Sequence, residues 1–66
     1  MILAAKITEE RKKNGWSQEE LANRLGVSRQ AVSKWECGKS DPSTSNLIAL
    51  AALFGTTAEE LLKEID

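Results

Sequence analysis

The sequence contains no histidine and only one cysteine, Cys37. No intramolecular disulfide can form, and no cluster of cysteine and histidine is available to hold a structural zinc ion. The chain also lacks a paired base and nucleophile for covalent catalysis, and it has no glycine-rich loop of the phosphate-binding type. We therefore expect no enzymatic activity, no metal and no cofactor, and a fold that depends on apolar helix faces for its stability.

Long apolar runs are also absent. The apolar stretch at residues 1–5 is interrupted by Lys6, so it is far too short for a membrane span, and it lacks the basic region of a signal peptide. With a lone thiol and no export signal, the sequence predicts a cytoplasmic protein. The 66 residues predict a single domain, 1–66, and a chain of this length hides only about 60% of its unfolded surface.

The net charge of −1 hides an uneven distribution of charge. Residues 11–39 carry seven basic and three acidic side chains, whereas residues 40–66 carry one basic and five acidic side chains. Such an asymmetry suggests a polyanionic partner for the basic half, although a chance division of surface charge explains it equally well.

Four glycines divide the chain into segments whose apolar residues recur at helical spacing. Each glycine suits a left-handed helix end, and each is followed by a residue that can cap the next helix. Ser17 and Thr57 begin two capping boxes, with a glutamate three residues later in each case. No segment alternates with the period of a strand. The pattern predicts an all-α fold of five helices at about 2–14, 18–25, 29–37, 44–54 and 58–65.

Apolar residues on these five segments are the candidates for the core. The fourth segment is apolar almost all round, which favours a central position in the fold. The expected core consists of Leu3, Ala4, Ile7, Leu21, Ala22, Leu25, Ala31, Val32, Trp35, Leu47, Ile48, Leu50, Ala51, Leu53, Phe54, Ala58, Leu61, Leu62 and Ile65.

The third predicted helix has two different faces. At about 100° per residue, the small and apolar side chains gather on one side and the polar ones on the other. Its polar side offers a guanidinium, an amide, a hydroxyl and an ammonium group, which match the edges of bases in the major groove. An ordinary solvated helix face has the same composition, so the helix alone does not decide between the two interpretations.

The context of this helix favours DNA. A short glycine-containing turn, residues 26–28, joins it to the preceding helix, as in a helix-turn-helix with its second helix in the major groove. The stretches 15–22 (GWSQEELA), 25–36 (LGVSRQAVSKWE) and 47–57 (LIALA followed by FGTT) resemble the Xre-type helix-turn-helix family of Cro proteins and phage repressors. The resemblance spans nearly the whole chain.

This resemblance implies a compact five-helix phage-repressor-like DNA-binding domain, with the helix-turn-helix at about 18–37, that regulates transcription by binding double-stranded DNA. The resemblance also implies that the domain acts as a repressor. The implied base-contacting residues are Arg29, Gln30, Ser33 and Lys34. The implied contacts to the DNA backbone are Gln18, Ser28, Lys39, Ser43 and Thr44.

Two further features follow from the resemblance. Arg11 and Glu36 match a structural salt bridge between the first and third helices. Relatives bind as homodimers on palindromic operators, and Leu61, Leu62 and Ile65 are the candidates for the dimer interface. The alternative is that these three residues close the core.

Two positions depart from the family pattern. Glu10 replaces a usual leucine, so the first helix is expected to pack less tightly. Cys37 replaces an arginine or asparagine that contacts phosphate, and no second thiol supports a redox role for it. A different class of function also remains open: an antitoxin or anti-repressor type of protein-interaction module, which would use the acidic C-terminal half on the same scaffold.

Overall fold

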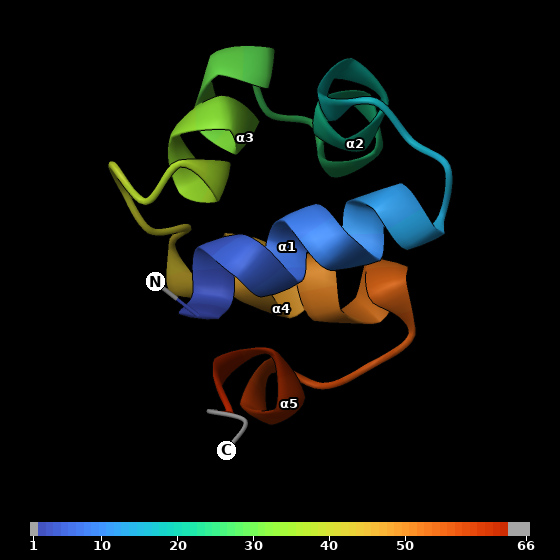
Figure 1. The fold of residues 1–66 in the computed structure, drawn as a ribbon. Helices are drawn as coiled ribbons and strands as arrows, with labels where there is room; N and C mark the ends of the chain where they lie inside the picture. The colour runs from blue at the N-terminus through green and yellow to red at the C-terminus, as the bar shows by residue number, and fades with distance from the viewer. Residues whose placement is uncertain (1, 64–66) are drawn as a thin grey trace.

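Five helices make up the part of the chain that the structure, a computed structural model, describes: residues 2–63 (Figure 1). α2 packs against α3 and α4, α1 packs against α3 and α5, and α4 packs against α5. α2 and α3 lie together at one end of the molecule and α5 lies at the other (Figure 1). The all-α prediction is confirmed, and the helices are α1 (Ile2–Lys13), α2 (Gln18–Leu25), α3 (Arg29–Glu36), α4 (Thr44–Phe54) and α5 (Ala58–Leu62).

The helix starts follow from hydroxyl side chains, as the capping pattern predicts. Each of four helices begins at a serine or threonine whose side-chain oxygen accepts a hydrogen bond from the backbone N–H three residues later, at 3.0–3.2 Å. These bonds satisfy N–H groups that a helix leaves without partners at its first turn. The capping residues are Ser17 for α2, Ser28 for α3, Ser43 for α4 and Thr57 for α5.

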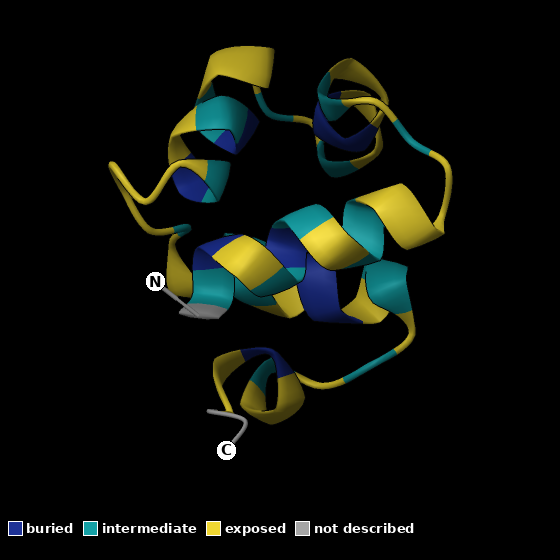
Figure 2. Ribbon diagram, in the orientation of Figure 1, coloured by how far each residue is buried: buried dark blue, intermediate teal, exposed yellow. Residues whose placement is uncertain are grey.

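The core lies where the inner faces of the five helices meet (Figure 2). Ile7, Leu21, Val32 and Leu50 have no exposed surface, and each comes from a different helix. Burying one side chain of this size stabilises the fold by about 1.5–3 kcal/mol. The buried residues, all of them predicted, are Ala4, Ile7, Leu21, Ala22, Val32, Trp35, Leu50, Ala51 and Leu61.

Two residues predicted for the core lie on the surface instead. Ile48 is 58% exposed and Leu62 is 54% exposed. A helix buries only the face that meets its neighbours, and α4 uses Leu50 and Ala51 for that contact. Ile48 points away from this contact, so the prediction for it was wrong, and the same holds for Leu62, beside the buried Leu61. Ile65 lies outside the described residues.

The C-terminal helix is shorter than predicted. α5 ends at Leu62, and Lys63 follows in an extended conformation with φ −69° and ψ 130°. Across residues 2–63, the longest helix has 12 residues, so none has the length and apolar character that crossing a bilayer requires.

Candidate nucleic-acid interface

The turn between α2 and α3 fixes the relation of these two helices. Gly26 adopts the left-handed conformation, with φ 75° and ψ 31°, which a side chain at this position would oppose. The backbone N–H groups of Gly26 and Val27 both donate to the carbonyl of Ala22, at 2.9 and 3.0 Å. Val27 is partly buried against the core, and Ser28 then starts α3. A three-residue turn thus joins two helices, as in a helix-turn-helix.

α3 presents one apolar face to the core and one polar face to solvent. Val32 and Trp35 are 0% and 5% exposed and anchor the inner face. On the outer face, Arg29, Gln30 and Lys34 are exposed. Ser33 is partly exposed and lies one helical turn after Arg29. The structure therefore leaves three long polar side chains of the predicted base-contacting set open to a partner.

The basic side chains on and just after α3 differ from Arg11 and Arg24 in their partners. Within residues 2–63, Arg29, Lys34 and Lys39 form no ion pair and no side-chain hydrogen bond. By contrast, Arg11 pairs with Glu36 and Arg24 pairs with Glu20, at 2.7 and 3.0 Å. The charges on and just after α3 remain available for an anionic partner.

Three side chains join α1, α2 and α3 at the C-terminal end of α3. Arg11 binds Glu36 through two hydrogen bonds, from Nε to Oε2 at 2.7 Å and from Nη2 to Oε1 at 3.0 Å. Its Nη1 donates to the carbonyl of Trp16 at 2.8 Å. Gln18, in the first turn of α2, donates from Nε2 to the same Glu36 Oε1 at 3.2 Å. The side chains of Arg11 and Glu36 are 13% and 7% exposed, so this is a nearly buried ion pair.

The surroundings of Glu36 favour its charged form. Burial by itself raises the pKa of this carboxyl group, but the hydrogen bonds from Arg11 and Gln18 and the charge of Arg11 outweigh it, and the net result is a lowered pKa. The hydrogen bond to Glu36 likewise raises the pKa of Arg11. The pair stays ionised and holds α3 at a fixed position against α1 and α2.

Trp16 connects the start of α2 to α4. Its ring lies against Phe54, with 6.3 Å between the ring centroids and 23° between the ring planes. The guanidinium of Arg24 lies 4.4 Å from the centre of the Trp16 ring, a distance typical of a cation–π contact. These contacts support the end of α2 from which Gln18 extends.

The residues predicted to contact the DNA backbone occupy helix starts and loops. The hydroxyl oxygens of Ser28 and Ser43 accept backbone hydrogen bonds as helix caps, which leaves their own protons free to be donated outward. Thr44 and Lys39 are exposed. Gln18 is partly exposed and donates to Glu36, a contact in addition to the predicted one with DNA.

The predicted dimer residues divide into different environments. Leu61 is 2% exposed and belongs to the core, so it offers no surface to a second chain, and its assignment to an interface was wrong. Leu62 is exposed. The remaining residue, Ile65, is not among those described.

Glu10 and Cys37, the two residues that differ from the family pattern, each contact a group of the helix that they belong to or follow. The carboxylate of Glu10 lies 3.3 Å from the Lys13 ammonium group on the same helix. The thiol of Cys37 is exposed and free, and its Sγ lies 3.6 Å from the carbonyl oxygen of Lys34. The described part of the chain contains no group of three histidine, cysteine, aspartate or glutamate residues placed to bind a metal.

Comparison with known proteins identifies the same region. Residues 7–61 match the model of the helix-turn-helix family. The crystal structure of the P22 c2 repressor in complex with a synthetic operator has a similar fold, with a TM-score of 0.89, 33% identity and coverage of 96% of both chains. The match includes α2, the turn and α3.

Curated relatives of the chain are also described as regulators. The HTH-type transcriptional regulator AnsR of Bacillus subtilis is 42% identical over 57 residues, which cover 86% of this chain and 49% of that protein. The HTH-type transcriptional activator BcrR of Enterococcus faecalis is 48% identical over 46 residues, 70% of this chain and 22% of its own length. The chain spans half or less of the length of these relatives.

Proposed function

The chain belongs to the helix-turn-helix family, of the type that includes phage repressors, and from this premise we propose that it is a sequence-specific DNA-binding regulator of transcription. The observation that carries the proposal is the orientation of α3. Val32 and Trp35 attach its inner face to the core, while Arg29, Gln30 and Lys34 extend from its outer face without partners among residues 2–63. The proposed output is repression, which the similarity to the c2 repressor over 96% of both chains supports.

The outer face of α3 has the chemistry that base recognition requires. Arginine and lysine donate hydrogen bonds to O6 and N7 of guanine, and glutamine pairs with N6 and N7 of adenine. Arg29 and Gln30 occupy the first turn of α3, the part of a recognition helix that contacts base edges, and Lys34 lies one turn further on. Ser33 has a hydroxyl that suits either an adenine or a guanine. We propose these four residues as the base contacts.

A second set of groups is proposed to bind phosphates and to position α3. Ser28, Ser43 and Thr44 lie at the starts of α3 and α4, where backbone N–H groups and the helix dipole favour an anion. Lys39 adds an exposed charge in the loop after α3. The remaining N–H of Gln18 is available for a phosphate while its first N–H holds Glu36.

A homodimer on a palindromic operator completes the proposed mode of binding. One α3 contacts only a few base pairs, and two copies place their recognition helices about one DNA turn apart. Leu62 is a large apolar side chain that is 54% exposed, and it lies on α5, at the far end of the molecule from α3 (Figure 1). A second copy bound through Leu62 leaves both α3 helices free for DNA.

Selection of bound duplexes from a random DNA pool tests this function. We expect wild-type protein to enrich one short sequence repeated with two-fold symmetry. A variant in which Arg29 and Gln30 are both replaced by alanine is expected to fold and to lose this enrichment, while Glu19→Ala, on an exposed residue of α2, keeps it. Failure of the wild-type protein to enrich any sequence at low salt would contradict the proposal and favour a protein partner instead.

A further inference from the structure

α5 is too short to be stable by its own backbone hydrogen bonds. It has five residues, and isolated helices shorter than about 12–15 residues are marginal in water. Its one fully buried side chain is Leu61. The position of α5 must therefore be fixed by contacts with the rest of the molecule.

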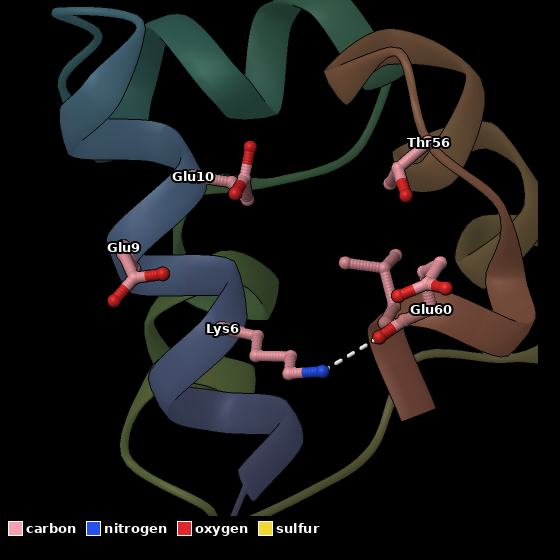
Figure 3. A pocket seen from close by; sticks show the side chains of 6 residues that line it. Lys6, Glu9, Glu10, Thr56 and Glu60 are labelled. Atoms are coloured by element: carbon pink, nitrogen blue, oxygen red, sulfur yellow. Dashed lines mark hydrogen bonds between the residues drawn. The ribbon is translucent and has the colours of Figure 1, made fainter. Parts of the chain in front are cut away.

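Lys6 of α1 supplies such a contact. Its Nζ donates hydrogen bonds to the backbone carbonyl oxygens of Glu60 and Lys63, both at 2.6 Å, across 54 and 57 residues of sequence (Figure 3 shows the first of them). The Glu60 carbonyl also accepts a hydrogen bond from the Lys63 N–H, at 3.4 Å, and a cation beside the carbonyl groups at the C-terminal end of a helix is favourable. Lys6 therefore caps α5 from a different helix.

The surroundings of Lys6 explain how it can do this. It borders a depression of about 170 Å³ between α1 and α5, and it is the one cation among the described residues that line this depression (Figure 3). Glu9, Glu10 and Glu60 line the same depression, yet Lys6 forms an ion pair with none of them. Its hydrogen bonds go to the backbone of Glu60 and Lys63 rather than to a carboxylate, which makes the contact independent of side-chain rotation on α5.

We infer that Lys6 is a positioning residue that sets the direction in which α5 presents Leu62 to a second copy of the chain. Leu61 holds α5 to the core, and Lys6 holds the carbonyls on either side of the Leu61–Leu62 pair. With these two attachments, rotation of α5 about its axis is prevented and the exposed Leu62 has one orientation. This inference rests on the proposed function, because it assumes dimerisation through Leu62.

Three variants of the full chain separate this role from general stability. Lys6→Met keeps most of the length of the side chain and removes its donors, and Lys6→Arg keeps a cation with N–H donors at this position. Lys12→Met is the matched control, because Lys12 is an exposed lysine of the same helix with no ion pair within residues 2–63. Circular dichroism on each variant measures the folded fraction.

The readouts are the dimer dissociation constant, from sedimentation equilibrium, and the exchange rates of the backbone amides of α5. We expect Lys6→Met to weaken dimerisation about tenfold, which corresponds to about 1.4 kcal/mol, slightly below the range of about 1.5–3 kcal/mol for a hydrogen bond to a charged group. Its α5 amides exchange faster, whereas its α3 amides do not. Lys6→Arg recovers most of the affinity, and Lys12→Met dimerises like the wild type.

Binding to a duplex that holds a single half-site separates this inference from the proposed function. Lys6→Met is expected to bind the half-site as tightly as wild type, because α3 is unchanged. If the wild-type protein does not bind the half-site duplex, the proposed function is contradicted. Any of four results would overturn the role of Lys6. Lys6→Met dimerises like the wild type or unfolds completely, Lys6→Arg does not recover the affinity, or the wild type is monomeric.

Discussion

Two groups of basic side chains in the molecule have different tasks. At the α5 end, Lys6 binds backbone carbonyls, and on α1 Arg11 binds a nearly buried carboxylate. On and after α3, Arg29, Lys34 and Lys39 have no partner of these kinds among residues 2–63. The first group stabilises the fold, and the second group is the one proposed to bind DNA. The net charge of −1 does not distinguish these two groups, whereas DNA binding depends on which basic side chains remain unpaired.

The largest expected effect is on stability, at the Arg11–Glu36 pair. Arg11→Met leaves the Glu36 carboxylate, 7% exposed, without its cation, and removal of one partner of a buried pair costs about 3–5 kcal/mol. Urea unfolding monitored by circular dichroism measures this loss.

The exposed pair on α2 is the matched control for that experiment. The side chains of Arg24 and Glu20 are 44% and 47% exposed, and an exposed pair is worth about 0.2–1 kcal/mol. Because Arg24→Met also removes the contact with Trp16, its free energy of unfolding is expected to fall by somewhat more than that range. Equal losses of stability in Arg11→Met and Arg24→Met would contradict the claim that the nearly buried pair stabilises the fold more than the exposed pair.

A smaller effect, on DNA rather than on stability, is expected from the outer face of α3. Arg29→Ala should lower discrimination at one base position by about 1–3 kcal/mol. Its free energy of unfolding should change by no more than about 0.5 kcal/mol, because the residue is exposed and unpaired within residues 2–63. Titrations of the selected operator and of single-base variants measure the discrimination. An equal loss on every sequence would contradict a base contact.

The pH dependence of stability follows from Glu36. Its pKa is lower in the folded protein than the ordinary value of 4.5, so its contribution is complete above 4.5 and is lost as the pH falls through the lowered folded pKa. The wild type is expected to lose stability over that acidic range. Glu36→Gln should give a flatter curve, at lower stability near neutral pH. Urea unfolding at a series of pH values measures both proteins. If stability falls with pH equally in the wild type and in Glu36→Gln, the loss does not come from Glu36.

The smallest effect is expected at Lys39. A single phosphate contact contributes about 0.9 to the slope of log K against log salt, so Lys39→Ala should lower that slope by about one. Its base preferences should not change. Binding measured at several salt concentrations on two operators tests both statements, and a change in base preference would move Lys39 into the base-contacting group.

Local signals in the sequence account for most of the fold. The caps at Ser17, Ser28, Ser43 and Thr57 and the glycines after the helices predicted all five helices, with four of them within one residue of the observed bounds. Capping and left-handed turns depend on a few neighbouring residues, so a single sequence is enough to recognise them. The nearly buried Arg11–Glu36 pair was expected from the family resemblance, and the structure contains it.

Features that depend on packing were not predictable in the same way. α4 is apolar on several sides, so periodicity did not show that Ile48 faces solvent. Both leucines at 61 and 62 were predicted for the core, but only Leu61 enters it, because of the contacts of α5 with α1 and α4. The bonds from Lys6 were missed because their acceptors are backbone carbonyls, which every residue has and which leave no pattern in the sequence.

The most direct test of the central claim is methylation protection of guanine N7, an atom that lies in the major groove. On the selected operator, wild-type protein is expected to protect at least one guanine in each half-site from dimethyl sulfate. Arg29→Ala, added at a concentration that saturates the same DNA, should lose that protection. Two results would show that the outer face of α3 does not contact the bases. Either the wild type protects no guanine, or the protection persists in all three variants, Arg29→Ala, Gln30→Ala and Lys34→Ala.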